Sequence, residues 1–197
     1  MAFSFLQKVF ARSPHRSMSV DISYHEILGV PVELVNTRAD IVNADVLERL
    51  TESLQLIHSV QPWRLRHLQR DVRAIRVERF ACRGAFQPSD RTIITELTFL
   101  ARRDITAAPV ASSIVHEGVH ARVHAMGVVR DERDLPREER LCRRAELSFG
   151  RALPEALGAP VVERALASLA LDDQAVAPAV DWREAERRIA QVDARAG

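Results

Sequence analysis

Two histidines and a glutamate lie close together in the segment His116-Glu117-Gly118-Val119-His120. Residues four positions apart share one face of a helix, so His116 and His120 can bind one metal ion together. In the H-E-x-x-H pattern Glu117 is not a ligand; it takes a proton from a metal-bound water and passes it to the leaving group. Zinc lowers the pKa of that water and polarises the carbonyl under attack. The segment therefore predicts a Zn²⁺-dependent hydrolase.

The residues around the two histidines favour this interpretation. Val115, Gly118, Val119 and Ala121 are uncharged and small or apolar, as a buried ligand helix requires. The alternative is a helix whose histidines are ordinary polar groups of the surface or the core. A catalytic zinc also needs a third protein ligand and an open position for water. The candidates for this ligand lie further along the chain and are Glu138, Glu139, Cys142 and Glu146.

Two predicted helices carry these residues. The first runs from about residue 109 to 126, where Gly127 supplies a stop. The second begins at Pro136, a residue suited to the first turn of a helix, and continues as far as Pro154. We therefore expect the metal segment to form the first arm of a helical hairpin over residues 110–154.

The H-E-x-x-H segment on one helix and a glutamate on the next resemble the thermolysin-like zinc peptidases, the gluzincins. The resemblance covers the helical hairpin and implies a peptide or protein substrate. It implies that His116 and His120 are metal ligands and that Glu117 is the general base. It makes Glu139 the third ligand, because its separation from His120 is like that in the family. Four residues later the family usually has an acidic residue that supports a histidine, whereas this chain has Arg143.

Glu146 is the rival third ligand, because a tight antiparallel hairpin would bring it level with the histidines. At roughly 1.5 Å per residue, Glu139 and Glu146 differ by about 10 Å along the helix axis, so they cannot bind one ion in the same geometry. The other glutamate would then orient a histidine or pair with an arginine on its own helix. Cys142 is a chemically reasonable ligand, but we favour its interpretation as a small buried helix residue.

The group that stabilises the oxyanion stays unassigned in the sequence. Gluzincin-like sites often use a tyrosine or a histidine for this purpose. The resemblance also suggests that Thr92–Leu100 is a sheet edge on which an extended peptide docks. The alternative is a strand that only covers the metal helix. The candidate donors, which we do not rank, are Tyr24, His25, His58, His67 and His124.

The rest of the chain predicts one mostly helical α+β domain over residues 20–197. In it, a small β-hairpin or sheet packs on a zincin-type metal helix and on the ligand helix that follows. The C-terminal region, residues 155–197, is expected to be helical and to cover the core. The expected elements are an extended segment with a turn at 20–36, a helix at 39–61, a short helix at 63–71, a β-hairpin at 73–100, the helical hairpin, and helices at 160–170 and 181–194.

Composition limits the remaining functions. A chain of 197 residues with 47% hydrophobic content can bury one sizeable core. Its net charge of +1 gives no overall field that selects for nucleic acid or an acidic membrane. Cys82 and Cys142 can form at most one disulfide, which suits a reducing compartment, so we expect a cytoplasmic location. No apolar stretch is long enough to predict a transmembrane segment.

The N-terminal residues 1–19 form a basic tail in which Phe3, Leu6 and Phe10 share a helical stripe. We interpret the tail as flexible or loosely docked, with weak membrane-surface contact as the alternative. Met18 is an alternative start of the mature protein.

Two other functions compete with a hydrolase. One is a catalytically silent domain that zinc staples together. A closed ligand set that adds Glu139 and Cys142 to the two histidines would favour it, whereas three protein ligands and a water favour catalysis. The other is a metal-free interaction module that binds nucleic acid or an acidic protein, against which the balanced charge and the 5% aromatic content argue. Its arginine-rich helices would use Arg64, Arg66, Arg70, Arg73 and Arg76.

Overall fold

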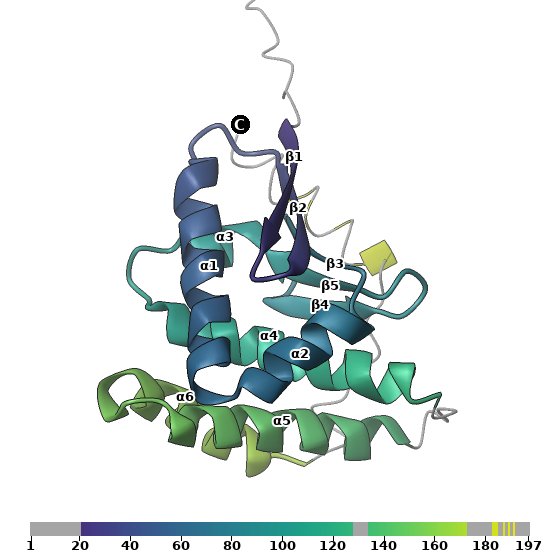
Figure 1. Ribbon diagram of the computed structural model, residues 1–197, viewed down its shortest axis with the longest axis vertical. Coiled ribbons are helices and arrows are strands. Elements are labelled where there is room, and N and C mark those ends of the chain that lie inside the picture. Colours follow the sequence, from purple (N-terminus) through teal and green to yellow (C-terminus); the bar gives the residue numbers. More distant parts are fainter. Residues whose placement is uncertain are drawn as a thin grey trace, which may run out of the picture.

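The computed structural model describes residues 21–127 and 134–172, together with residues 183, 184, 187, 189 and 191. The predicted N-terminal tail, and most of the helix predicted at 181–194, lie outside the described residues. Within the described part, six helices and one five-stranded sheet form an α+β domain that is mostly helical (Figure 1). The predicted fold class is confirmed.

The sheet is mixed and has the strand order β1-β2-β3-β5-β4. Strands β1 and β2 form an antiparallel hairpin, and β2, β3 and β5 run parallel to one another. Strand β4 pairs antiparallel with β5 and is one edge of the sheet. The strand bounds are β1 Asp21–Ile27, β2 Val30–Asn36, β3 Ala74–Glu78, β4 Gly84–Gln87 and β5 Thr92–Glu96.

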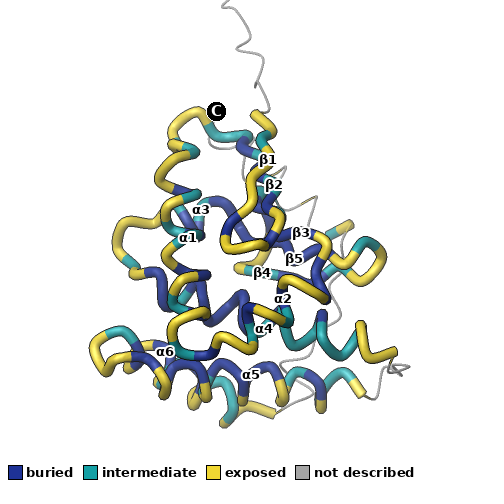
Figure 2. The backbone as a smooth tube through the Cα atoms, viewed as in Figure 1, coloured by how far each residue is buried: buried dark blue, intermediate teal, exposed yellow. Residues whose placement is uncertain are grey.

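Helix α4 lies at the centre of the domain and is mostly buried (Figure 2). It packs against β4 and β5 on one side and against α1, α2, α5 and α6 elsewhere. Helix α5 packs against α4 and in turn supports α6. The helix bounds are α1 Asn43–Val60, α2 Pro62–Asp71, α3 Leu97–Ala101, α4 Ala107–Ala125, α5 Leu135–Ala152 and α6 Glu155–Leu169.

The interpretation of residues 73–100 as a β-hairpin was wrong. Strands β3 and β5, near the two ends of this range, are parallel neighbours, and the antiparallel hairpin consists of β4 and β5. The sequence signal was misleading because β4 has only 4 residues and directly precedes the turn formers. Strand β3 is paired on both sides, which is typical of the interior of a parallel sheet.

The prediction that Thr92–Leu100 forms one strand at a sheet edge was also wrong. Strand β5 lies inside the sheet and ends at Glu96. There the Glu96 carboxylate accepts hydrogen bonds from the Phe99 backbone N–H at 2.7 Å and from the Thr98 hydroxyl at 2.5 Å. This N-cap starts the short helix α3 immediately after the strand. Among the described strands, the sheet edge beside α4 is therefore β4.

The helices were predicted more accurately than the sheet. The metal helix begins at Ala107, slightly earlier than predicted, because the Thr106 hydroxyl accepts a hydrogen bond from the Ala108 backbone N–H at 3.4 Å. It ends before Gly127, whose positive φ of 69° suits a helix stop. Among the described residues, no helix combines the length and apolar character that a membrane span requires.

Candidate metal centre

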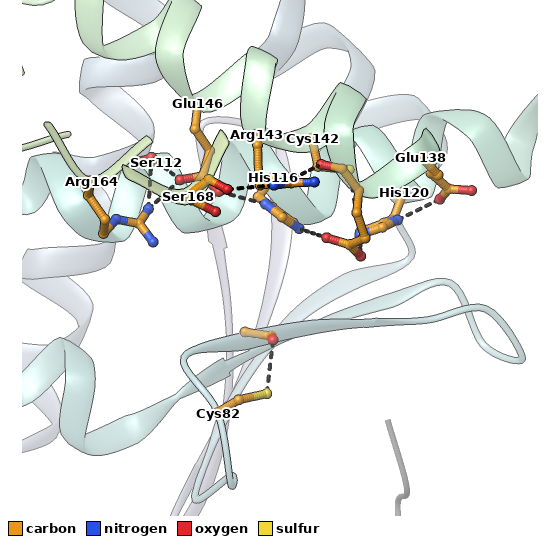
Figure 3. Close-up of polar contacts among 12 residues, drawn as sticks. Cys82, Ser112, His116, His120, Glu138, Cys142, Arg143, Glu146, Arg164 and Ser168 are labelled. Atoms are coloured by element: carbon orange, nitrogen blue, oxygen red, sulfur yellow. Dashed lines mark hydrogen bonds and ion pairs between the residues drawn. The ribbon is translucent and has the colours of Figure 1, made fainter. Parts of the chain in front are cut away.

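Helices α4 and α5 position the candidate site between them. His116 and His120 lie on the face of α4 that meets α5, and α5 contributes a row of glutamates and one cysteine (Figure 3). Both histidine side chains are mostly buried, with 17% and 12% of their surface exposed. Burial of so many polar groups is favourable only when each has a partner.

Each imidazole is held by a carboxylate on its Nδ1 atom. His116 Nδ1 lies 2.6 Å from Glu146 Oε1, and His120 Nδ1 lies 2.5 Å from Glu138 Oε1. An Nδ1–H group that donates to a carboxylate fixes the ring orientation and leaves Nε2 as the metal-binding nitrogen. Metal-ligating histidines usually donate their other ring N–H to a carboxylate, a backbone carbonyl or a water, and both imidazoles fit this pattern.

The two Nε2 atoms face the same carboxylate. Glu139 Oε2 lies 3.2 Å from Nε2 of His116, and Glu139 Oε1 lies 3.1 Å from Nε2 of His120. Two imidazole nitrogens and one carboxylate thus converge on a common point. Zn²⁺ binds this combination of donors in catalytic sites.

Cys142 is the other donor close to this point. Its sulfur lies 3.5 Å from His120 Nε2, and one donor atom each from His116, His120 and Cys142 lie within 4.8 Å of one another. The thiol is fully buried, and burial raises its pKa, although hydrogen bonding to His120 acts in the opposite direction. Both Glu139 and Cys142 are therefore placed where a third or fourth ligand would bind.

The site favours positive charge at the two imidazoles. Burial alone would lower the pKa of His116, but hydrogen bonds to Glu139 and Glu146 hold this pKa well above its usual value. Burial raises the pKa of Glu139, yet hydrogen bonds from both histidines bring it down to about 2. Two protons or one divalent cation can supply the positive charge that these carboxylates stabilise.

Glu117 lies beside the histidines, and its surroundings differ from those of the other glutamates. It is only 8% exposed, and this burial raises its pKa above the usual value. The backbone of β4 approaches it closely, because a Cβ atom at Gly84 would lie 3.3 Å from Glu117 Cγ and 2.9 Å from Ser113 Oγ. A raised pKa makes a carboxylate a stronger base and so favours the transfer of a proton to it.

Helix α6 contributes to the site, although the sequence indicated only a covering role for it. The Arg164 guanidinium forms an ion pair with Glu146, and the Ser112 hydroxyl lies 3.1 Å from Glu146 Oε2. These contacts hold the carboxylate that supports His116. The available signal was that Arg164 is the only basic residue in an otherwise largely apolar helix.

Arg143 occupies the position at which the gluzincins usually have an acidic residue. Its Nε donates to the Glu139 backbone oxygen at 3.2 Å, and its Nη1 donates to the Ser168 backbone oxygen at 2.6 Å. It therefore connects α5 to α6. Glu146 contacts His116 on Nδ1, which is the opposite side of the ring from Glu139, so the rival glutamate occupies an orienting position.

A cleft of about 320 Å³ opens beside these groups. It lies between the start of β4, the metal helix α4, and helices α5 and α6. Its polar lining includes His116, Glu117, Glu139, Arg83, Arg143 and Arg164. The cleft therefore borders two of the groups that face the point of convergence, His116 and Glu139, and it also borders Glu117.

The candidate oxyanion donors lie elsewhere in the domain. Tyr24 is 75% exposed on β1, at the opposite edge of the sheet from β4. His67 lines a different hollow, and His124 packs against the Phe86 ring with 5.7 Å between ring centroids. His25 on β1 and His58 near the end of α1 are exposed. None of these five is among the described residues that line the cleft.

Comparisons with protein-family models, curated proteins and solved structures found no match to this chain.

Proposed function

We propose that this protein is a zinc-dependent hydrolase that cleaves peptide bonds in the cytoplasm. The observation that carries the proposal is the convergence of His116 Nε2, His120 Nε2 and the Glu139 carboxylate on one point. Two further carboxylates hold the imidazoles by their Nδ1 atoms, and Glu117 lies buried next to this point.

The residues present fit a zinc ion in their number and chemistry. His116, His120 and Glu139 would hold the ion, with Glu146 and Glu138 orienting the two imidazoles. When bound, zinc would polarise a substrate carbonyl and make a water molecule more acidic. Glu117 would receive the proton of that water and deliver it to the departing amine. Its raised pKa suits both halves of this transfer.

Strand β4 supports a peptide as the substrate. It is a sheet edge directly beside α4, and an extended peptide can add to such an edge through main-chain hydrogen bonds. The close approach of Gly84 to Glu117 would bring a peptide on this edge near the general base. We therefore expect a peptide to dock on β4, and not on the Thr92–Leu100 segment that the resemblance suggested.

Metal analysis of the purified protein tests the proposal. We expect near-stoichiometric zinc in the wild type and in Glu117→Gln, and none in His116→Ala. His67→Ala is the matched control, because His67 lies outside the cleft. A peptide library should be cleaved by the wild type, with turnover lower by about 10²–10⁴-fold in Glu117→Gln. A wild type that takes up no added zinc would contradict the proposal.

A second function is favoured by the position of Cys142. If its thiolate bound the ion together with His116, His120 and Glu139, the site would be closed and its zinc structural. Substitution of Co²⁺ for zinc distinguishes the two functions. A thiolate-to-cobalt charge-transfer band that disappears in Cys142→Ser would favour the structural site, whereas a Cys142→Ser variant with full zinc content and full turnover would favour the hydrolase.

An interaction module based on the arginines of α2 and β3 receives less support. Arg70 pairs with Asp71 at 2.7 Å, and Arg76 pairs with Glu33 at 2.9 Å. Arg64 stacks on Trp63, with its Cζ atom 4.3 Å from the ring centroid. Because these side chains are paired or stacked within the domain, they are less able to donate hydrogen bonds to the phosphates of a nucleic acid.

A further inference from the structure

Arg83 differs from the other arginines of the cleft in its contacts. It lies immediately before β4, and its backbone oxygen accepts a hydrogen bond from the Glu96 backbone N–H at 3.1 Å. Its guanidinium lies over the Phe99 ring, with Cζ 5.2 Å from the centroid. Among the described residues, no carboxylate pairs with it, whereas Arg164 is paired with Glu146.

The charge of the cleft would favour an anionic group. Three arginines and three glutamates line it, so a bound divalent cation would leave the lining with an excess of positive charge. Burial and the guanidinium groups of Arg164 and Arg102, which are themselves paired with Glu146 and Asp104, lower the pKa of Arg83, whereas the Glu146 carboxylate acts in the opposite direction. An anion that binds between neighbouring guanidinium groups lowers the electrostatic repulsion between them.

We propose that Arg83 binds a carboxylate of the peptide substrate, so that the enzyme selects peptides with a carboxylate close to the bond that is cleaved. This inference rests on the proposed function, because it places the carboxylate in the same cleft as the metal-binding residues. A guanidinium can hold a carboxylate through two parallel hydrogen bonds, and its position over the Phe99 ring restricts its orientation. The carboxylate belongs either to the C-terminus of a short peptide or to an aspartate or glutamate side chain.

A binding experiment tests the inference without turnover. Zinc-loaded protein is titrated by calorimetry with ω-carboxy alkanehydroxamates of increasing chain length and with their carboxamide analogues. The hydroxamate group is the metal-binding part of both probes. We expect the best carboxylate probe to bind the wild type about tenfold or more tightly than its carboxamide, in line with a charged hydrogen-bonded pair. Arg83→Gln should abolish this preference and leave carboxamide binding unchanged.

Arg103→Gln is the matched control for Arg83→Gln. The Arg103 side chain is 92% exposed and lies outside the cleft, so its substitution removes the same charge without altering the lining. This variant should keep the tenfold preference. A preference that declines equally in both variants would reflect the overall charge and would overturn the role of Arg83. Arg83→Lys should keep only part of the preference, because an ammonium group cannot form the paired hydrogen bonds.

Paired peptides distinguish the two sources of the carboxylate. Loss of cleavage on C-terminal amidation would identify the terminal carboxylate, and loss on exchange of Glu for Gln would identify a side chain. In either case Arg83→Gln should remove the difference. If the wild type binds carboxamide hydroxamates and cleaves peptides with no preference for a carboxylate, the hydrolase stands and this inference fails. If the protein binds neither zinc nor hydroxamates, the proposed function fails and the inference fails with it.

Discussion

Helix α4 borders two hollows of similar size that differ in their chemistry. The cleft of about 320 Å³ is lined by glutamates, arginines and the metal-segment histidine His116. The other, which we call the apolar hollow, has a volume of about 270 Å³ between α2, α4 and α5. Its lining includes Trp63, Leu68, Val115, Val119 and Leu141. Available space therefore does not distinguish the two.

The histidines of the two hollows experience opposite electrostatic environments. Burial and the nearby Arg122 and Arg70 lower the pKa of His67 in the apolar hollow. In the cleft, by contrast, the carboxylates around His116 hold its pKa above the usual value despite burial. One environment disfavours a cation and the other favours it. Convergent carboxylates, and not the histidine itself, make the cleft the candidate metal centre.

The largest expected effect separates Glu139 from the glutamates that support the histidines. Glu139→Gln should weaken zinc binding by more than about 100-fold, because it removes the charge that faces both Nε2 atoms. Glu146→Gln and Glu138→Gln should weaken it by about 10–100-fold, as is usual for orienting carboxylates. Competition with a chromophoric chelator measures all three affinities. His67→Gln, the control from the apolar hollow, should bind zinc as the wild type does.

The opposite ranking would revise the site. If Glu146→Gln lost as much affinity as Glu139→Gln or more, Glu146 would be the ligand and Glu139 the supporting group. If His67→Gln also lost zinc, the contrast between the two hollows would be wrong.

The local features of the site were easier to predict from the sequence than the non-local ones. The spacing of His116 and His120 and the stop at Gly127 are local features, so the metal helix was predicted closely. The pairing of β3 with β5 is non-local, and the intervening β4 is too short to produce a clear pattern. The edge strand was therefore assigned to the wrong segment.

The details of the site depend on how two helices are rotated against each other. The sequence offered Glu139, Cys142 and Glu146 as ligand candidates on the second helix but left open which side chain approaches Nε2. It offered Glu138 only as a ligand candidate, whereas the structure places this residue against Nδ1 of His120. A difference of one residue turns a helix by about 100°, and tertiary packing decides which glutamate faces the two Nε2 atoms. Arg83 had no local pattern that connected it to this site, and the only signal for Arg164 was its position as the one basic residue of the largely apolar α6.

Gly84 on β4 lines the cleft and Gly118 within α4 lines the apolar hollow, so substitutions at these two glycines compare the hollows directly and should have effects of intermediate size. A Cβ at Gly84 would meet Ser113 and Glu117 in the cleft, whereas a Cβ at Gly118 would meet Leu68 Cδ2 at 3.0 Å in the apolar hollow. Gly84→Ala should lower kcat/KM about tenfold or more by displacing the general base, with zinc content unchanged. Gly118→Ala should change stability by no more than about 1 kcal/mol, because helix propensity offsets the crowding of a flexible leucine end. Steady-state kinetics and urea unfolding of both variants measure these effects, and equal loss of activity would contradict the functional difference.

The smallest expected effect concerns Asp71, which lies beside the apolar hollow at the end of α2. Burial raises the pKa of its carboxyl, but the hydrogen bond from Arg70 and the charges of Arg70 and Arg122 produce a net lowering. Because the folded-state pKa lies below the unfolded value of about 3.9, the ionised carboxylate stabilises the fold at pH values above the unfolded pKa. This contribution is lost as the pH falls through the folded-state pKa. Asp71→Asn should therefore reduce the free energy of unfolding by up to about 1 kcal/mol at pH 7, as for other partly exposed ion pairs, and by less at pH 3. Urea unfolding in the presence of a chelator, which removes any contribution of bound metal, measures the difference at both pH values. An equal difference at pH 7 and pH 3 would show that the carboxyl is not stabilised in its charged form. Loss of zinc binding in this variant at pH 7 would show that the two sides of α4 are not independent.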